Sequence, residues 1–241
     1  MSLLKLKYEL RKSSNRQQAK ILQRFFKTGC GEYAQGDIFL GARAPVLRSL
    51  AWRYQDLSFN EVLRLLKSPI HEERLLSLLI FILKYRKADS LGKERIYKAY
   101  LRYSRYINNW DLVDVSAKHI VGDFLADKDR SVIYKLASSD LLWERRVAIV
   151  STFYFIENND FRDTLRIAAI LIGDPHDLIH KAVGWMLREV GKRDSVAEER
   201  FLKKYSHIMP RTMLRYAIER FPQYKRQAYL QKKRVIRKSL K

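Results

Sequence analysis

Apolar residues recur at the three- and four-residue spacing of an α-helix along almost the whole chain. The 241 residues include only 9 glycines and 5 prolines, and no Asn-Gly or Asp-Gly pair marks a β-hairpin. The pattern therefore predicts an all-α protein of about twelve to fourteen helices, most of them about ten to eighteen residues long. Clear examples of the spacing are Leu63, Leu66 and Ile70, then Leu75, Leu78, Leu79 and Ile82, and later Val147, Val150, Phe153 and Tyr154.

A two-helix period of about forty residues is visible from Ser58 onward, and helix pairs of that size stack into right-handed superhelical solenoids. Ser58 and Asp160 are expected N-caps, because their side chains can accept the free amide hydrogens of a first helical turn. We therefore expect a single domain over residues 1–241. Its parts are an N-terminal helical pair (1–27), a glycine-containing connector (28–42), the repeats (43–224) and a basic C-terminal segment (225–241).

Positive charge dominates the composition. Lys and Arg number 48 against 26 acidic residues, which gives a formal net charge of +22. A domain this basic is typical of proteins that bind a polyanion, and the alternative is a basic protein without such a partner. From Lys225 to Lys241 there are eight basic residues and no acidic one, which fits either a final helix along a phosphate backbone or a solvated end.

Cys30 is the single cysteine, so no internal disulfide can form, and we expect a reducing, cytoplasmic location with nucleoid association. The longest apolar stretch, Leu75 to Leu83, is too short to span a bilayer, and the N-terminus lacks the arrangement of a signal peptide. His176 and His180 have the i, i+4 spacing of zinc ligands, but no third ligand lies nearby. The sequence indicates neither a metal nor an organic cofactor.

Trp110 and Asp114 stand four residues apart in the segment Asn109-Trp110-Asp111-Leu112-Val113-Asp114. On a helix that starts at Asp111, with Trp110 at the cap, the indole and the Asp114 carboxylate point the same way. An aromatic ring beside a carboxylate in a cationic protein suggests chemistry on a nucleic acid. The alternative is that Trp110 is a core anchor and Asp114 a surface or capping carboxylate.

Two further tryptophans each precede an arginine by one helical turn: Trp143 precedes Arg146, and Trp185 precedes Arg188. An arginine beside an apolar run can pair with a buried acid, can hold a phosphate through its planar fork, or can extend to solvent while its stem packs. Gly184 is expected to leave space beside the Trp185 indole.

These motifs together, in this order on a basic helical chain, resemble the AlkD-type DNA alkylation-repair glycosylases, which are built of HEAT-like repeats. The resemblance covers about Gln17 to about Tyr224. It rests on Phe39-Leu40-Gly41-Ala42-Arg43-Ala44-Pro45-Val46-Leu47-Arg48, Trp110-Asp111-Leu112-Val113-Asp114, Trp143-Glu144-Arg145-Arg146-Val147-Ala148-Ile149 and Ala182-Val183-Gly184-Trp185-Met186-Leu187-Arg188-Glu189.

The resemblance implies a role for each matching residue. Asp114 matches the catalytic carboxylate, and Trp110 and Trp185 match the indoles that pack against the lesion nucleotide's backbone and deoxyribose. Contacts to DNA phosphates along a concave basic cleft are expected from Arg146 and Arg188, and further DNA contacts from Phe25, Arg43, Arg145 and Lys181. The chain departs from the family pattern at two places. The family often has a tyrosine that faces the cleft, where the nearest match in this chain is Phe25, and some members have tandem tryptophans where this chain has Asn109-Trp110.

The implied activity is hydrolytic removal of positively charged alkylated bases, of the 3-methyladenine and 7-methylguanine type, from duplex DNA. The resemblance also implies that the damaged base need not be flipped into a pocket. We expect a monomer without membrane contact. Two alternatives stay open from the residues: a non-catalytic helical-repeat protein that binds duplex or branched DNA, and a protein-interaction module of the same fold.

Overall fold

The computed structural model describes residues 2–231, and in this range every regular element is a helix except for one isolated parallel bridge between Ile38 and Ile70. The prediction of an all-α fold is confirmed. Internal contacts group the chain into two compact units, the first ending at Phe124 and the second starting at Leu125. Residues 232–241 of the predicted basic C-terminal segment lie outside the described range.

The first unit contains seven α-helices in its described residues. They are α1 (Leu3–Lys12), α2 (Arg16–Phe25), α3 (Ala44–Arg53), α4 (Phe59–Leu66), α5 (His71–Lys87), α6 (Ser90–Arg102) and α7 (Trp110–Ala117). A short 3-10 turn at Ser104–Tyr106 precedes α7, and a π-helical turn at Lys118–Gly122 continues it.

The second unit contains eight α-helices in its described residues. They are α8 (Ser131–Ala137), α9 (Leu142–Ser151), α10 (Phe153–Glu157), α11 (Arg162–Ile170), α12 (Asp177–Gly191), α13 (Ser195–Tyr205), α14 (Arg211–Ala217) and α15 (Gln223–Gln231). Two 3-10 turns, Leu171–Gly173 and Ile218–Arg220, extend α11 and α14. Several of these helices are shorter than expected, because turns of other hydrogen-bonding type interrupt the apolar pattern that the sequence presents as continuous.

The two expected N-caps differ in outcome. Ser58 caps α4 with a capping box, since its hydroxyl accepts from the Glu61 amide while the Glu61 carboxylate accepts from the Ser58 amide at 2.9 Å. Asp160 is not the N-cap of α11, which begins at Arg162 with Phe161 at the cap position. The Asp160 carboxylate nevertheless accepts the Arg162 amide of the first turn at 3.3 Å through Oδ1, while its Oδ2 pairs with Arg130 at 2.6 Å.

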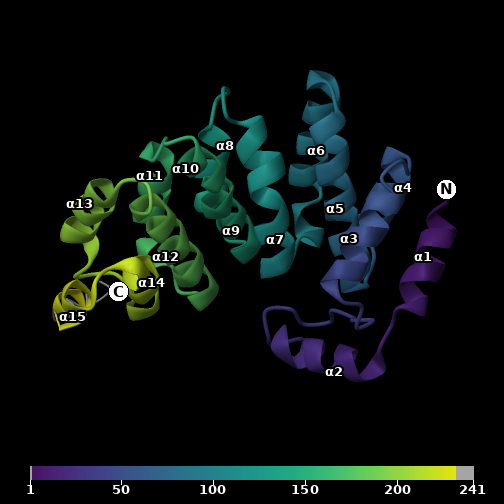
Figure 1. Cartoon of the computed structure of the whole chain (residues 1–241), viewed down its shortest axis with the longest axis horizontal. Coiled ribbons are helices and arrows are strands. Elements are labelled where there is room, and N and C mark those ends of the chain that lie inside the picture. Colours follow the sequence, from purple (N-terminus) through teal and green to yellow (C-terminus); the bar gives the residue numbers. More distant parts are fainter. Residues whose placement is uncertain (1, 232–241) are drawn as a thin grey trace. The chain divides into compact units, whose positions relative to one another are not determined.

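Helix α5 is the centre of the first unit and packs against α3, α4, α6 and α7 (Figure 1). Its side chains Leu76, Leu78 and Ile80 are fully buried, and even the polar residues of its first turn are enclosed. This explains why α5 lacks a distinct polar face: neighbouring helices surround it, so one apolar stripe does not suffice.

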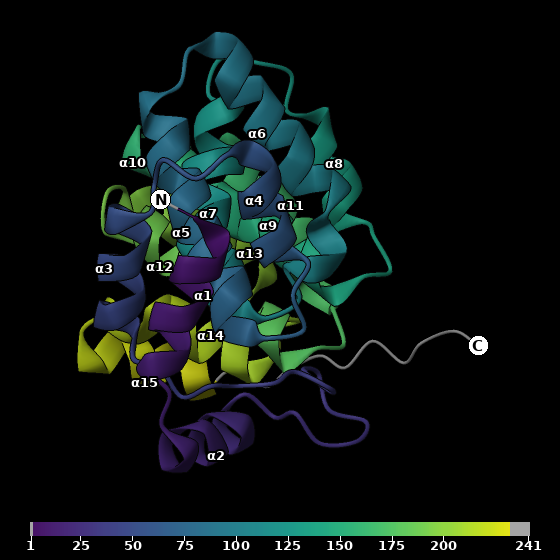
Figure 2. The same ribbon diagram turned by 90° about the vertical axis from the view of Figure 1, so that its right-hand side faces the viewer.

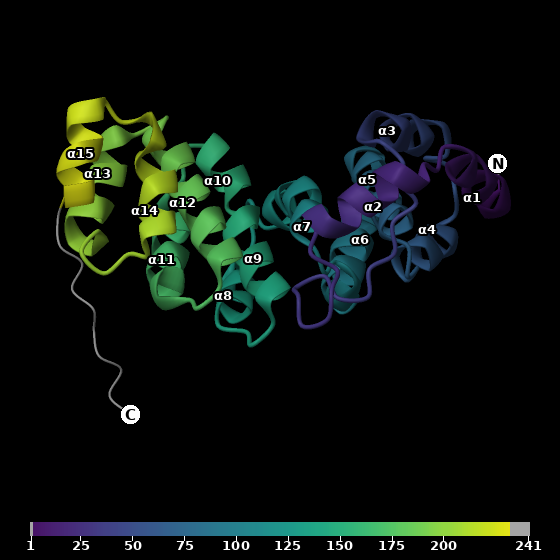
Figure 3. The same cartoon turned by 90° about the horizontal axis from the view of Figure 1, so that it is seen from below.

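Helix α2 runs beyond the ends of α1 and α3 and, seen from below, crosses over α5 (Figures 2 and 3). The connector after it returns to α5, where the Glu72 carboxylate accepts the amides of Leu40 at 3.0 Å and Gly41 at 2.7 Å. Gly41 has a positive φ of 82°, and a Cβ there would lie 2.2 Å from the Asn15 carbonyl oxygen. Glycine is therefore required where the connector passes the start of α2.

In the second unit α12 packs between α9 and α14 (Figure 1). Gly184 makes the contact with α14 possible, since a Cβ there would lie 2.4 Å from the Met213 carbonyl oxygen. The expectation that Gly184 leaves space beside the Trp185 indole is wrong: the backbone of α14 fills that space. Among the described residues, no helix has both the length and the hydrophobicity needed to cross a membrane.

Candidate active site

Helix α7 positions Trp110 and Asp114 one turn apart in the first unit. The helix begins at Trp110, one residue earlier than expected, because Asn109 is the N-cap. The Asn109 side chain accepts the Trp110 amide at 2.8 Å. Asp111 lies in the first turn, where its negative charge favours the positive helix terminus. Both Trp110 and Asp114 are half-buried.

A column of aromatic rings supports Trp110 from one side. The Phe26 ring stacks on the indole with centroids 5.0 Å apart, and Phe39 stacks on Phe26 at 5.0 Å. The His71 imidazole contacts both of these phenylalanines, with its centroid 4.4 Å from Phe39 and 5.1 Å from Phe26. Phe25, whose side chain is 61% exposed, meets the indole edge-on at 5.8 Å. The rings of α2 and its connector thus fix the orientation of an indole on α7.

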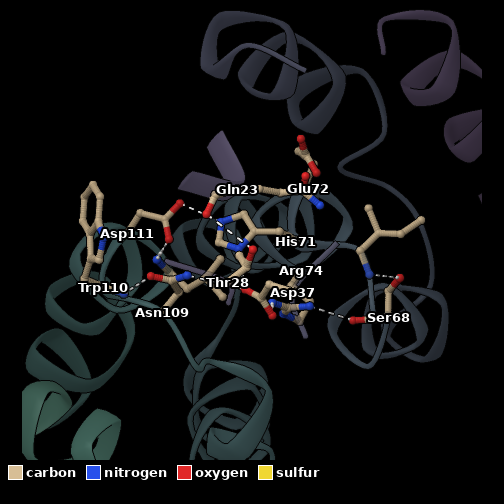
Figure 4. A network of polar contacts seen from close by, with 12 residues as sticks. Gln23, Thr28, Asp37, Ser68, His71, Glu72, Arg74, Asn109, Trp110 and Asp111 are labelled. Carbon is tan, nitrogen blue, oxygen red and sulfur yellow. Dashed lines mark hydrogen bonds and ion pairs between the residues drawn. The ribbon is translucent and has the colours of Figure 1, made fainter. Parts of the chain in front are cut away.

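A chain of polar contacts runs beside the aromatic column and reaches the same helix (Figure 4). Arg74 donates to Asp37 at 2.6 Å, and Asp37 contacts His71 Nδ1 at 3.1 Å. The other ring nitrogen, His71 Nε2, lies 2.8 Å from the Asp111 carboxylate. Since each ring nitrogen faces a carboxylate oxygen, which can only accept, the imidazolium form satisfies both contacts. The first turn of α7 is therefore tied to the buried start of α5.

The pKa directions in this network agree with that protonation state. Burial lowers the pKa of His71, but hydrogen bonds to Asp111 and Asp37 outweigh it and raise the pKa overall. For Asp37, burial raises the pKa, but the hydrogen bond from His71 and the positive charge of Arg74 outweigh burial. The pKa of Asp37 is therefore lowered overall. A positive imidazole between two carboxylates is thus the stable state of the site.

Asp114 lies beside a buried tyrosine of α6. The Tyr100 hydroxyl is 3.0 Å from Ser116 Oγ, and its pKa is raised by burial and by the negative charge of Asp114. Tyr100 therefore stays neutral. The two acids of α7 thus act on different groups: Asp111 pairs with the imidazole of His71, whereas the charge of Asp114 acts on the phenol of Tyr100.

The second unit holds Trp185 and Arg188 on α12. The Trp185 indole donates to Glu189 at 3.1 Å and meets the Phe153 ring edge-on at 5.6 Å. Arg188 pairs with Glu219 and, at 3.4 Å, with Glu189. Any phosphate bound by Arg188 therefore competes with two carboxylates for the guanidinium.

The other predicted DNA-contacting residues fall into two groups. Arg43 is exposed at the start of α3, and Lys181 is partly exposed and pairs with Asp177 at 2.8 Å. Arg145 pairs with Asp174 at 2.6 Å, and Arg146, only 5% exposed, donates to the Leu178 carbonyl at 2.5 Å. Arg145 and Arg146 thus hold the loop before α12 and its first turn, and Arg145 shows the pairing with a buried acid that the sequence left open for an arginine beside an apolar run.

The two histidines with zinc-like spacing both contact the backbone around the start of α12. His176 is the N-cap, and its Nδ1 accepts the Leu178 amide at 3.1 Å. His180 Nε2 lies 2.6 Å from the Asp174 carbonyl oxygen. Both side chains therefore stabilise the turn at the start of α12.

Sequence reasoning missed His71, Asp37 and Arg74 as supports of the site. Asp37 and His71 are 34 residues apart, and His71 and Asp111 are 40 apart. No local spacing links them. One available signal was the charged cluster His71-Glu72-Glu73-Arg74 at the start of an otherwise apolar helix, because buried charges require partners elsewhere in the fold.

Comparisons with known proteins agree on one family. A family model described as DNA alkylation repair enzyme matches residues 6–221. No curated protein matches the sequence. Among solved structures, a predicted DNA alkylation repair enzyme from Enterococcus faecalis is similar in fold, with a TM-score of 0.67, 15% sequence identity, and coverage of 88% of this chain and 98% of that one. The family match spans both units and every candidate residue, as the AlkD-type resemblance predicted. The chain belongs to the DNA alkylation repair enzyme family.

Proposed function

We propose that the protein is a DNA glycosylase that hydrolyses the N-glycosidic bond of positively charged alkylated bases in duplex DNA. The family membership supports a role in alkylation repair. The observation that carries the finer proposal is the arrangement on α7. There a supported indole, Trp110, stands one turn from Asp114, a half-buried carboxylate on the same helix.

The reaction requires a negative charge beside the sugar, and it does not require a general acid to protonate the leaving base. A base alkylated on a ring nitrogen already carries a positive charge, so it departs as a neutral molecule when the bond from C1′ to nitrogen breaks with its electron pair. The deoxyribose then becomes cationic, and the Asp114 carboxylate stabilises that charge. Water adds to C1′ and gives up one proton, which Asp114 accepts and passes to solvent. The products are the free base, an abasic site and a proton.

The aromatic column adds two contributions in this proposal. The face of Trp110 attracts the developing positive charge on the sugar through its π-electrons. The Phe26 ring behind it keeps the indole from rotating, so that the face is held in place before substrate binds. The exposure of Phe25 at the indole edge supports its assignment as a contact to the bound DNA.

Binding to the duplex is assigned to the positive surface. With 48 basic against 26 acidic residues, affinity without sequence preference follows from counterion release. Arg43 and Lys181 are accessible for phosphate contacts. Arg188, Arg145 and Arg146 fit this role only if phosphate oxygens replace or extend their present contacts.

The test is release of methylated base from methylated duplex DNA under single-turnover conditions. Asp114→Asn keeps the shape of the side chain and removes the charge, so we expect release to fall by roughly a thousandfold or more, the scale for loss of a transition-state charge contact. Duplex binding should persist. Asp123→Asn, which removes another carboxylate of the first unit, is the matched control and should release base like the parent protein.

Two outcomes would contradict the proposal in different ways. Undiminished release by the Asp114→Asn variant would remove Asp114 from the mechanism. Binding of duplex by the parent protein without any release would favour the runner-up, a non-catalytic protein that binds duplex or branched DNA, which the charge balance also supports.

A further inference from the structure

Helices α3, α5 and α7 enclose a second surface feature of the first unit, a hollow of about 360 Å³. Helix α3 contributes Arg48 and Trp52, and α5 contributes Leu83 and Arg86. From the end of α7 and the π-helical turn come Val115 and His119. These six residues, which we call the indole groove, take no part in the mechanism above.

An exposed tryptophan is the most unusual member of the groove. The Trp52 side chain is 62% exposed, although indoles are normally mostly enclosed. Leu83 and Val115, both partly exposed, supply an apolar floor. Lys87 lies with its Nζ 5.8 Å from the centroid of the indole and adds a positive charge at the edge. The groove thus offers a flat apolar surface between cations.

The charge of the groove distinguishes it from similar hollows in the described part of the chain. Its lining includes Arg48 and Arg86 but no carboxylate. A hollow of about 390 Å³ between α4 and α6 also has arginines beside an aromatic ring, but Glu94 lines it too. The hollow around Tyr134 contains Asp163. The indole groove is therefore suited to an anionic ligand with an apolar body.

A segment of DNA backbone has this chemistry. Phosphates alternate with deoxyribose rings, whose carbon-rich faces pack on indoles, and arginine forks bind phosphate oxygens. A basic peptide is disfavoured by the positive charge of the groove. Val115 directly follows Asp114 on α7, so the groove begins within one helical turn of the candidate active site.

We propose that the indole groove is a second DNA-binding subsite, in which Trp52 packs against a deoxyribose and Arg48 and Arg86 hold the flanking phosphates. The subsite takes backbone a short way along the strand from the excised base. This inference rests on the proposed function for its ligand. It extends that function by naming contacts that hold DNA without touching the reacting sugar.

Equilibrium binding of unmodified duplex at several salt concentrations tests the subsite. Loss of one phosphate contact reduces the salt slope by about 0.9, so Arg48→Ala combined with Arg86→Ala should reduce it by roughly two and weaken binding about tenfold. Trp52→Ala should weaken binding about fivefold with an unchanged slope.

The matched control removes the same charge from the other hollow. Arg95 and Arg102 line the hollow between α4 and α6, and both are exposed. Arg95→Ala combined with Arg102→Ala should reduce the salt slope by less than half of the reduction expected for the Arg48→Ala and Arg86→Ala double variant. Equal weakening by the two double variants would overturn the subsite, because overall charge would then explain the effect. Unchanged binding by Trp52→Ala would overturn it as well.

Failure of the subsite and failure of the proposed function give different results. If the parent protein binds duplex through the groove but releases no base, the subsite stands and the glycosylase proposal fails. If the parent protein releases base while the groove variants bind DNA like the parent, the subsite fails and the glycosylase proposal stands. Failure of the parent protein to bind duplex, or binding of an acidic peptide in preference to DNA, overturns the subsite.

Discussion

His71 Nε2 lies 2.8 Å from the Asp111 carboxylate, so a buried imidazole on α5 fixes the first turn of the helix that carries Trp110 and Asp114. The opposite ring nitrogen is held by Asp37, which Arg74 in turn holds. The charged imidazole has a carboxylate on each side. Removal of one of these groups leaves the others buried without a compensating charge, so the network is strongly coupled to the fold.

His71→Gln should therefore destabilise the protein by roughly 3 kcal/mol below neutral pH. The folded pKa of His71 is raised above its ordinary value of 6.5 by the two carboxylates, which outweigh burial. The stabilisation from this raised pKa is fully present below pH 6.5 and is lost as the pH rises through the folded pKa. Thermal unfolding of the two proteins across pH measures the difference, which should shrink at alkaline pH.

His207→Gln is the matched control for that experiment, since His207 is exposed. A constant stability difference between the parent and His71→Gln at all pH values would show that the imidazole is neutral in the folded protein. The polar chain would then act through shape and neutral hydrogen bonds alone.

Phe26→Leu tests whether Phe26 supports the Trp110 indole during catalysis in addition to stabilising the folded protein. The substitution removes the ring between Trp110 and Phe39 at a cost of about 1–2 kcal/mol, since each aromatic pair contributes roughly 0.5–1.5 kcal/mol beyond burial. We expect the single-turnover release of methylated base to fall as well. Phe59→Leu breaks the Phe59–Phe81 pair, 5.4 Å between centroids, and should destabilise the unit without slowing release. Equal release rates in the two variants would argue against the supporting role.

Gly184→Ala should destabilise the second unit by about 1–3 kcal/mol, the usual cost of overpacking. The added Cβ would lie 2.4 Å from the Met213 carbonyl oxygen and 2.5 Å from the Tyr216 Cβ, which forces α12 and α14 apart. Gly173→Ala is the control, because nothing lies within 4 Å of a Cβ at that position. Urea unfolding of both variants checks the prediction, and a stable Gly184→Ala protein would show that the helices can separate freely.

Glu198→Gln should stabilise the protein at alkaline pH. Burial and the negative charge of Glu199 raise the pKa of Glu198 to about 8, from an ordinary value of 4.5. The folded protein therefore holds one more proton than the unfolded chain between these values, and stability falls as the pH rises through that window. Glutamine cannot ionise, so the variant should gain roughly 4 kcal/mol near pH 8 and almost nothing near pH 4.5. Parallel unfolding profiles for the two proteins across this range would contradict the assignment.

The sequence by itself determined the class of fold and the local placement of the candidate residues. Helical periodicity is a local property, so it predicted the helices, and the capping box at Ser58 was readable because its partners are three residues apart. The pairing of Trp110 with Asp114 followed for the same reason, since residues four apart share a helix face. Boundaries moved by one residue where a neighbouring side chain, such as Asn109, proved the better cap.

Only the tertiary structure decided what surrounds those residues. Stacking of Phe26 on Trp110, the imidazole of His71 between two carboxylates, and the groove beside Trp52 all join segments that lie far apart in the chain. Gly184 shows the limit most clearly, because its neighbour is the backbone of α14 and no pattern within α12 reveals it. Local spacing fixes which side chains share a helix face, whereas packing between helices fixes which of those faces meet.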